Sequence, residues 1–352
     1  MIRPLRTAVA GAAITLIALT AAGCGTTAVE SSAGDGPQAT SEACQNDTSA
    51  TATGPVEITD GVGRTVKLDA PAQRVAVLEW QQVEDALTLC VAPVAVSDPE
   101  GYSTWVSAEK LPENVVDLGT RGEPDLDALY GADPDLIIVE AFDADADIVR
   151  TLEKESDVPV LVTVGADTKD PIGNMKQVFT LIAEATGRTD RADEVLADFD
   201  QHLADAKQKV SKADLPTTDF VFFDGWVEGS NLIVRPYGEG ALFTAFGEEL
   251  GLTPAWTSDI DKAYGSGGVD PAYGLAQTDL EGLTAVGNAN LFYSKDEEGG
   301  YTDELEKSSI WTSLPAVTEG RAHAFPAGVW GAGGPLSGEQ AVDAFVDVIL
   351  QK

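Results

Sequence analysis

The sequence predicts an α/β protein with two similar lobes joined by one long helix. Short apolar segments alternate with amphipathic ones along most of the chain, as expected for a parallel sheet covered by helices. An acidic helix start followed by a buried strand occurs at 125–139 and returns, in altered form, at 279–293. The 352 residues also exceed what one hydrophobic core usually fills.

The first 23 residues have the features of a secretory signal. Two Arg residues precede an uncharged run, Ala8 to Thr20, that is too short for a comfortable membrane span. Ala21-Ala22-Gly23 then precede Cys24, which resembles a bacterial lipobox, where this Cys is acylated and begins the mature protein. An ordinary secretory signal with a chance Cys is the alternative. We expect a signal peptide over 1–23 and a lipid on Cys24.

The chain is strongly acidic, with 58 Asp and Glu against 22 Lys and Arg and a formal net charge of −36. Removing residues 1–23, which hold two Arg and no acid, makes the net charge −38. Such a surface repels nucleic acid and anionic headgroups, so nucleic-acid binding is excluded. A small anionic ligand would need a local basic site.

A flexible tether is predicted for residues 24–55, because this segment is rich in Ser, Thr, Ala and Gly and has almost no large apolar residue. After Cys24, two cysteines remain, Cys44 in the tether and Cys90 at the end of an apolar helix. An oxidising exterior permits a disulfide between them, which would pin the tether to the first lobe. Two unpaired thiols are the alternative.

The first lobe is predicted over residues 56–168. It opens with a hairpin, because two alternating segments flank Asp60-Gly61-Val62-Gly63. Buried strands separated by helices follow. We expect the strands at 74–78, 91–96, around 117, 136–140 and 160–164, and helices at 81–90 and 152–156.

Residues 169–213 are predicted to be helical and to connect the lobes. A helix over 171–186 precedes a longer one, over 190–212, whose apolar residues recur at intervals of three and four. Roughly 23 helical residues span about 35 Å, the scale of a whole domain. A single helix is therefore expected to bridge the two lobes.

The second lobe is predicted over residues 214–352. Its first strand, 220–226, is similar to the segment that ends Leu78-Glu79-Trp80. Further strands are expected at 231–234, 290–293 and 321–325, and helices at 241–250, at 301–305 and at 338–350.

Aromatic and Arg residues follow several predicted strands. In open α/β sheets the ligand crevice lies beyond the carboxyl ends of the strands, where rings supply contact area and guanidinium groups grip oxygen atoms. Such residues suit a bulky, partly apolar ligand with acceptor oxygens, although each ring could equally pack its own loop. The candidate ligand-binding residues are Trp80, Tyr102, Trp105, Arg121, Phe142, Trp226, Arg235, Tyr237 and Trp330.

Common enzyme motifs are missing from the sequence, which has no G-x-S-x-G, P-loop, H-E-x-x-H or Cys/His cluster. Only two His residues occur, His202 and His323, and core or surface positions are expected for both. We therefore predict no catalytic residues, no metal site made by the protein and no cofactor. An extracytoplasmic hydrolase stays open as an alternative without a supporting motif.

Several segments spread over residues 56–350 have a characteristic sequence and spacing. They are P-A-Q-R-V-A-V-L-E-W at 71–80, G-E-P-D-L-D-A-L-Y-G-A-D-P-D-L-I-I at 122–138, the helix at 190–212, T-D-L-E-G-L at 278–283, L-P-A-V-T-E-G-R-A-H-A-F at 314–325 and W-G…G-P-L-S at 330–337. In sequence and spacing they resemble the substrate-binding lipoproteins of bacterial iron-siderophore ABC importers, the helical-hinge class that also handles cobalamin and heme. The resemblance implies two Rossmann-like α/β lobes joined by one long helix, the class III periplasmic binding protein fold, with lobe closure limited to a small hinge motion.

The resemblance implies that the protein captures a ferric siderophore and delivers it to an ABC permease, from a lipid-anchored position on the extracytoplasmic face of the cell membrane. Arg121 matches the position from which hydroxamate-siderophore binders place an Arg on the iron-chelating oxygens, and Arg235 is the candidate in the second lobe. The siderophore, rather than the protein, is expected to coordinate the iron. Cobalamin or heme is the alternative ligand.

Two carboxylates match the residues that dock onto permease Arg side chains in this family. They are Asp127 in the first lobe and Glu281 in the second, where Asp127 is one methylene shorter than the usual Glu. Acidic residues that complement the dipole at a helix N-terminus are the alternative explanation for each.

Overall fold

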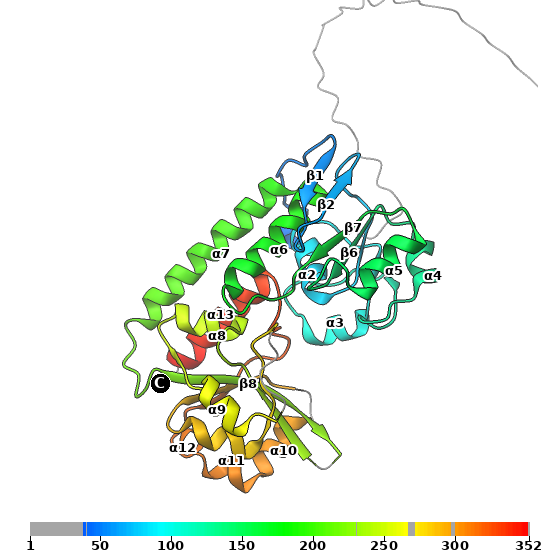
Figure 1. Ribbon diagram of the computed structural model, residues 1–352. Helices are drawn as coiled ribbons and strands as arrows, with labels where there is room; N and C mark the ends of the chain where they lie inside the picture. The colour runs from blue at the N-terminus through cyan, green and yellow to red at the C-terminus, as the bar shows by residue number, and fades with distance from the viewer. Residues whose placement is uncertain (1–37, 40, 230, 267–271, 297–299, 351–352) are drawn as a thin grey trace, which may run out of the picture. The chain divides into compact units, whose positions relative to one another are not determined.

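The computed structural model describes residues 38–350, apart from residues 40, 230, 267–271 and 297–299 (Figure 1). The predicted signal peptide, Cys24 and the first part of the tether lie outside the described residues. The described chain contains two α/β lobes, with two helices, α6 (Pro171–Thr186) and α7 (Thr189–Val210), between them in sequence.

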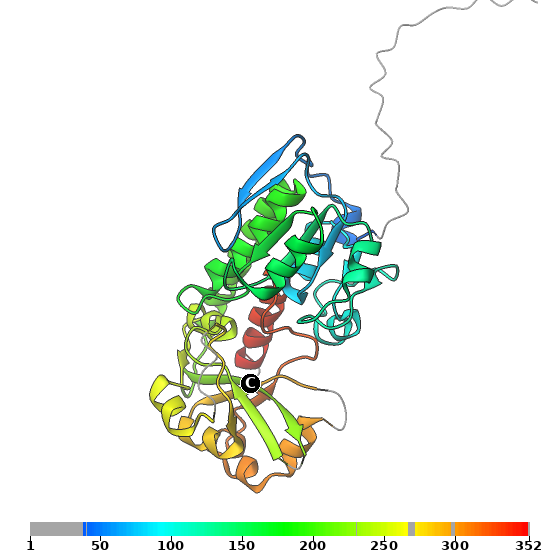
Figure 2. The same ribbon diagram turned by 45° about the vertical axis from the view of Figure 1, so that its right-hand side comes forward.

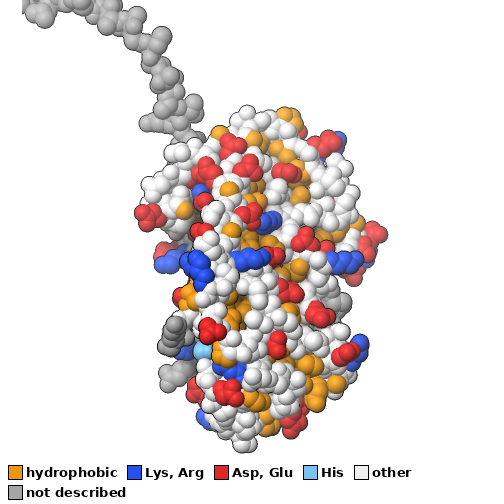
Figure 3. All heavy atoms as spheres, turned by 90° about the vertical axis from the view of Figure 1, so that its left-hand side faces the viewer, with side chains coloured by type: hydrophobic (Ala, Val, Ile, Leu, Met, Phe, Trp, Pro, Cys, Tyr) orange, Lys and Arg blue, Asp and Glu red, His pale blue; other side chains and the backbone are white. Residues whose placement is uncertain are grey.

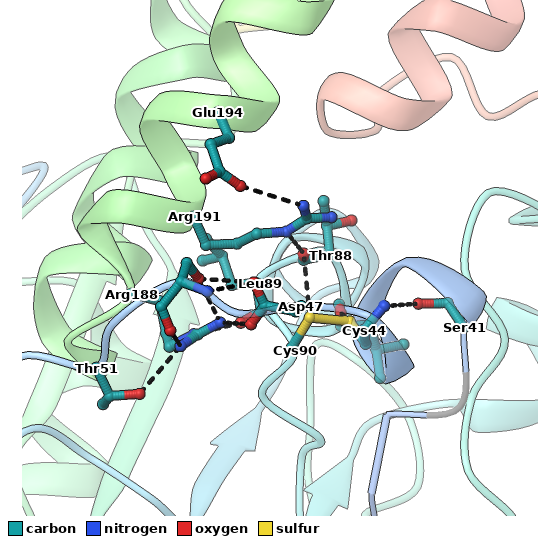
Figure 4. A network of polar contacts seen from close by, with 12 residues as sticks. Ser41, Cys44, Asp47, Thr51, Thr88, Leu89, Cys90, Arg188, Arg191 and Glu194 are labelled. Atoms are coloured by element: carbon teal, nitrogen blue, oxygen red, sulfur yellow. Dashed lines mark hydrogen bonds and ion pairs between the residues drawn. A yellow bond between two sulfur atoms is a disulfide. The ribbon is translucent and has the colours of Figure 1, made fainter.

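The last part of the predicted tether is not a free linker, because residues 41–55 lie on the first lobe. Helix α1 (Glu42–Gln45) carries Cys44, which forms a disulfide with Cys90. Arg188, just before α7, donates hydrogen bonds to Asp47 and to Oγ1 of Thr51, the latter at 3.0 Å (Figure 4). Composition alone does not reveal this attachment, because a covalent bond and an ion pair hold the segment, which buries little apolar surface of its own.

The first lobe is built on a five-stranded parallel sheet with the order β5-β4-β3-β6-β7. Its strands are β3 (Val75–Val77), β4 (Ala95–Val96), β5 (Val116–Asp117), β6 (Leu136–Glu140) and β7 (Val160–Thr163). A separate antiparallel hairpin precedes it, formed by β1 (Val56–Thr59) and β2 (Thr65–Leu68). Its helices are α2 (Trp80–Thr88), α3 (Pro99–Trp105), α4 (Leu126–Gly131) and α5 (Asp147–Glu155).

Each central strand of this sheet contributes to two cores, because neighbouring side chains of a strand point to opposite faces. In β6, Leu136 and Ile138 belong to the core that contains residues of α2 and α6. Ile137 and Val139 belong to the core on the other face, with residues of α4 and α5. Burial on both faces explains why these strands are continuous apolar runs rather than alternating ones.

Helix α7 contributes to the cores of both lobes. It has 22 residues, which corresponds to a length of about 33 Å. Ala192 and Val195 pack in the first-lobe core, whereas Phe199 and Ala206 pack in a second-lobe core. The single long helix between the lobes is therefore present, with ends one and two residues away from those predicted.

The second lobe is built on a mixed six-stranded sheet with the order β11-β9-β8-β12-β13, and β10 also pairs with β8. The strands β8, β12 and β13 are parallel, whereas β9 runs antiparallel to β8. The strands are β8 (Asp219–Glu228), β9 (Asn231–Pro236), β10 (Thr253–Pro254), β11 (Thr278–Asp279), β12 (Asn290–Tyr293) and β13 (Ala322–Ala324).

Helices cover both faces of this sheet. Phe220 and Phe222 of β8 pack towards α8 (Leu242–Glu249) and α13 (Pro335–Leu350), whereas Val221 and Phe223 pack towards the other face. Figures 1 and 2 show the two groups of helices on opposite sides of β8. The helices of the second face are α9 (Ser258–Tyr264), the 3₁₀ helix η1 (Leu280–Val286), α10 (Tyr301–Lys307), α11 (Ser309–Ser313) and α12 (Pro315–Thr318).

The two lobes share the element that recurs in the sequence. Oδ1 of Asp125 caps α4 by accepting hydrogen bonds from the backbone N–H groups of Asp127 and Ala128, at 2.9 and 3.0 Å. Oδ1 of Asp279 caps η1 by accepting from the N–H of Gly282 at 3.3 Å. The strands that follow, β6 and β12, each lie between two parallel neighbours. The repeat therefore reflects a shared structural unit, although its second helix is 3₁₀.

The surface is acidic on the face shown in Figure 3, where Asp and Glu side chains are spread over both lobes rather than gathered in one patch. Among the described residues, no helix combines the length and the apolar character that crossing a membrane requires. On this face, therefore, the negative charge is distributed over both lobes.

Candidate ligand-binding site

A pocket of about 280 Å³ is lined by residues of both lobes. On the first-lobe side, Glu79 follows β3, Arg121 follows β5, and Glu140 ends β6, so all three lie at the carboxyl edge of the sheet. The lining residues are Glu79, Gln81, Arg121, Glu140, Gly165, Ala166, Pro171, Met175, Arg235, Tyr237, Gly240, Leu242, Tyr273, Leu275, Trp330, Gly331 and Ala332.

Arg121 is held between a carboxylate and an aromatic ring. Its Nη1 donates to Oε1 of Glu79 at 2.5 Å, and its guanidinium carbon lies 3.8 Å from the ring centroid of Trp80. Glu79 also accepts from the backbone N–H of Trp80 at 2.8 Å, which fixes the start of α2. The Trp80 ring is buried and meets the edge of Trp330, with centroids 5.1 Å apart. These contacts orient the guanidinium at the pocket wall.

Arg235 makes the corresponding ion pair in the second lobe. Its Nε and Nη2 donate to the two carboxylate oxygens of Asp224, at 2.8 and 2.5 Å, in a bidentate arrangement. The Tyr237 hydroxyl donates to Oδ2 of Asp224 at 3.1 Å. Burial raises the pKa of Tyr237 and the Asp224 carboxylate raises it further, so the phenol stays protonated as a donor. Asp224 thus fixes the positions of two lining residues.

Glu140 is the third carboxylate of the site. One of its oxygens accepts a hydrogen bond from the hydroxyl of Tyr273, which belongs to the second lobe. A Cβ at Gly165 would lie 2.1 Å from the other oxygen, so a side chain there would displace the Glu140 carboxyl group. Burial raises the pKa of Glu140 to about 7, the Tyr273 hydrogen bond lowers it, and the Glu79 charge raises it. Near neutral pH this group is therefore divided between carboxyl and carboxylate.

Four of the nine predicted ligand-binding residues line the pocket: Arg121, Arg235, Tyr237 and Trp330. A fifth, Trp80, does not line the pocket itself, but the Arg121 guanidinium lies against its buried ring. The rule that ligand sites lie at the carboxyl ends of strands thus led to residues of both lobes that line this pocket.

The other four predicted aromatic residues do not line the pocket. Tyr102 is a core residue, fully buried, and its hydroxyl donates to the carbonyl of Glu109 at 2.9 Å. Trp105 ends α3 with 41% of its surface exposed, and Trp226 lies on the β8–β9 hairpin with 37% exposed. Phe142 is 51% exposed and contacts Tyr273 through its ring edge. A sequence pattern places these residues after strands, but it does not give the direction of their side chains.

Several lining residues were missed, among them Glu79, Glu140, Met175 and Tyr273. Glu79 and Glu140 directly follow or end predicted strands, so the rule that found Arg121 could have found them. In a chain with 58 Asp and Glu residues, nothing in the sequence distinguished these two from the other acidic residues. Tyr273 lies in a loop that no strand or helix signal identifies.

The remaining predicted functional residues lie away from the pocket. Asp127 and Glu281 are exposed in the first turns of α4 and η1, where Asp125 and Asp279 make the capping hydrogen bonds. Nε2 of His202 on α7 lies 2.9 Å from Oδ1 of Asp343 on α13, in a surface contact. His323 lies in β13, where burial lowers its pKa.

Relatives identified by sequence comparison align with most of the chain. The iron(3+)-hydroxamate-binding protein FhuD of Escherichia coli K12 is 24% identical over 264 residues, which cover 75% of this chain and 82% of that protein. The probable siderophore-binding lipoprotein YfiY of Bacillus subtilis 168 is 26% identical over 296 residues, which cover 80% of this chain and 85% of that protein.

Structural comparison gives the same fold. The siderophore-binding protein FhuD of Vibrio cholerae, solved with Fe³⁺-Desferal, matches with a TM-score of 0.66 at 24% identity, covering 79% of this chain and 98% of that chain. The triscatecholate siderophore-binding protein FeuA of Bacillus subtilis matches with a TM-score of 0.63 at 20% identity, covering 83% of this chain and 97% of that chain. The model of the periplasmic binding protein family matches residues 75–327. The chain therefore belongs to the periplasmic binding protein family.

Proposed function

We propose that this chain is an extracytoplasmic solute-binding protein that captures a ferric siderophore and delivers it to the transmembrane subunits of an ABC permease. The observation that carries the proposal is Arg121, a guanidinium held at the pocket wall by Glu79 and Trp80. Two relatives named for iron-hydroxamate and siderophore binding support the ligand class.

The arginines grip the oxygen atoms of the ligand in this proposal. A guanidinium has five N–H donors, and the Glu79 contact of Arg121 uses only Nη1. Its other N–H groups donate to oxygens that chelate the iron, while Met175, Leu242 and Trp330 contact the organic backbone. The iron is part of the cargo and stays bound to the siderophore.

Binding rather than catalysis fits the pocket. Its polar contacts include two ion pairs and two hydrogen bonds from a phenol to a carboxyl group, and no Ser, Cys or His lines it within the described part of the chain. A hydrolase would need a positioned nucleophile or an activated water. Mass spectrometry of a ferric siderophore after incubation with the protein tests the alternative, because cleavage products would support it.

Delivery to a permease requires attachment to the membrane and contacts with the permease. A lipid on Cys24 holds the protein at the membrane, and Asp127 and Glu281, one on each lobe, contact the permease. The long helix α7, which is packed in both lobes, limits lobe closure to a small hinge motion.

The proposed ligand class is tested by native mass spectrometry of the full chain with ferric siderophores, cobalamin and heme. Ferric siderophores should give a one-to-one complex that survives competition by the other two ligands, which visible absorption follows. Retention of cobalamin or heme with release of the iron complex would show that the protein is a cobalamin- or heme-binding member of the same class. Binding of none of the three would contradict the proposal.

A further inference from the structure

The positive charges of the pocket are already matched by the protein itself. Arg121 pairs with Glu79, and Arg235 pairs with Asp224. Glu140 is a third carboxylate, which accepts a hydrogen bond from Tyr273. No Lys or His lines the pocket among the described residues. The lining therefore offers two guanidinium groups and no excess positive charge.

Ferric siderophores differ in charge according to their chelating groups. Three hydroxamates neutralise Fe(III) and give a neutral complex, whereas three catecholates leave a triply negative one. A trihydroxamate with a terminal amine is positively charged as a complex at neutral pH. The pocket can therefore distinguish these classes by electrostatics alone.

A triply negative complex is disfavoured here. To bind it, Arg121 or Arg235 would have to leave Glu79 or Asp224, and a partly buried carboxylate would lose its partner. A neutral complex needs no such exchange, because its chelating oxygens can accept from N–H groups that the ion pairs do not use. The arrangement thus rejects excess negative charge and accepts neutral oxygen-rich ligands.

Glu140 adds a preference of its own. Its side chain faces the charged groups of Glu79 and Arg121, the phenol of Tyr273, the amide of Gln82 and the backbone at Gly165. We infer that the pocket takes ferric complexes without net negative charge, and that Glu140 selects among them for a ligand that carries an ammonium group. This inference rests on the proposed function, because it assigns the ligand class of the same pocket.

If Glu140 contacts the ammonium group, the affinity for the ligand should depend on pH. Burial raises the pKa of this group to about 7, so part of it is protonated near neutral pH. An ammonium group beside it stabilises the carboxylate form and lowers this pKa. Binding of an amine-bearing complex then releases a proton and becomes tighter as pH rises through this pKa. Binding of the same complex with its amine acetylated lacks this dependence.

The test is isothermal titration calorimetry of the full chain with three ferric complexes. They are ferric Desferal, which has a terminal amine; its N-acetylated form; and ferri-bacillibactin, a tricatecholate. Each is titrated one pH unit below and one above the pKa of about 7. The variant is Glu140→Gln, which removes the charge and keeps hydrogen-bonding capacity, and the control is Glu113→Gln in an exposed loop before β5.

At the higher pH, wild-type protein should bind the amine complex about tenfold more tightly than the acetylated one and the tricatecholate at least about tenfold more weakly than either. Glu140→Gln should abolish the preference for the amine and its pH dependence, so that the amine complex and the acetylated complex bind with similar affinity at both pH values. Glu113→Gln should match wild type. Retained binding of the acetylated complex also shows that the variant is folded.

Two results overturn the inference while the proposed function stands. One is a tricatecholate that binds as tightly as the acetylated complex, and the other is an amine preference that persists in Glu140→Gln or is absent from wild type. Should no ferric complex bind at all, the proposed function itself fails. The comparison of the two Desferal complexes on wild-type protein decides the role of the amine even if the variant does not fold.

Discussion

Ser337, in the first turn of α13, donates two hydrogen bonds to the carboxyl group of Glu84 on α2, from its backbone N at 2.8 Å and from Oγ at 2.5 Å. Both residues are buried. Glu84 belongs to the first lobe, whereas most of α13 packs in the second, so this contact joins the lobes beside α7. Burial raises the pKa of Glu84 to about 7 and raises the pKa of the adjacent Asp85 well above its usual value.

Stability should therefore fall as pH rises through the neutral range. Between the unfolded pKa of Glu, about 4.3, and the folded value near 7, the native state binds a proton that the unfolded state has lost, so the free energy of unfolding decreases with increasing pH. We expect a loss of about 2 kcal/mol between pH ~5 and ~8. In Glu84→Gln, which keeps a side-chain acceptor and donor for Ser337, the part of the slope due to Glu84 should disappear, while Asp85 and Glu140, whose pKa values burial also raises, should keep their parts.

Urea unfolding followed by circular dichroism across this pH range measures the effect. Glu155→Gln, an exposed acid at the end of α5, is the matched control and should retain the wild-type slope. A stability that is flat with pH in the wild-type protein, or a slope that Glu84→Gln leaves intact, would show that Glu84 does not titrate in the neutral range.

Arg121→Ala should weaken binding of a ferric trihydroxamate by about tenfold to a hundredfold, because a charge-assisted hydrogen bond to the ligand and the contact over Trp80 are both lost. Arg121→Lys should recover little of this affinity, since an ammonium group cannot lie flat on the ring or donate in a fork. Quenching of tryptophan fluorescence during titration gives the dissociation constants. Arg150→Ala on the exposed face of α5 is the control. Equal affinities of Arg121→Ala and wild type would show that Arg121 does not contribute to ligand binding.

Reduction of the Cys44–Cys90 disulfide should destabilise the first lobe and loosen the attachment of residues 41–55. The bond closes a loop with a sequence separation of 46, for which the chain-entropy model gives roughly 2–4 kcal/mol. The Arg188–Asp47 ion pair remains and holds part of the segment. Cys44→Ala/Cys90→Ala should lower the denaturation midpoint and speed proteolysis near residue 47, while ligand affinity stays unchanged. Two thiols that titrate in the unreduced, denatured wild type would rule out the bond.

The regular elements of the fold were predictable because their signals are local. β12 and α6 have the predicted bounds, since an apolar run between turns and an amphipathic stretch started by a proline each define their ends. The predicted strand at 91–96 is reduced to Ala95–Val96, because Cys90 has a positive φ of 63° and Pro93 has no N–H to donate. Segments fixed by long-range contacts, such as 41–55, gave no local signal.

The candidate site was predictable as a place and only partly as a set of residues. Arg121, Arg235 and Trp330 were included because residues after the carboxyl ends of strands border the expected crevice, and all three line the pocket. Tyr102 was wrongly included, since its burial depends on packing between α3 and the loop at Glu109. Glu140 was missed because its importance arises from Tyr273, which approaches it from the other lobe.

Asp127 and Glu281 should matter for uptake and not for ligand binding. Both are exposed, and the capping of their helices is done by Asp125 and Asp279, so Asp127→Ala and Glu281→Ala should leave the fold and the ligand affinity intact. Each should lower uptake of the iron complex by about tenfold, because a carboxylate that docks onto a permease Arg contributes a charge-assisted contact. The measurement is uptake of radioactive iron in cells that express the cognate permease, alongside the dissociation constant of the purified variant.

The shorter side chain of Asp127 provides a second comparison within this prediction. Asp127→Glu extends the carboxylate by one methylene and should keep or raise the uptake rate, whereas Asp127→Ala should lower it. Asp193→Ala, an exposed acid on α7, has the same change in charge and should have no effect. If Asp127→Ala and Glu281→Ala transport iron at the wild-type rate, the acids at these helix starts serve only to complement the helix dipole. If they fail to bind the ligand as well, their effect is on the fold rather than on docking.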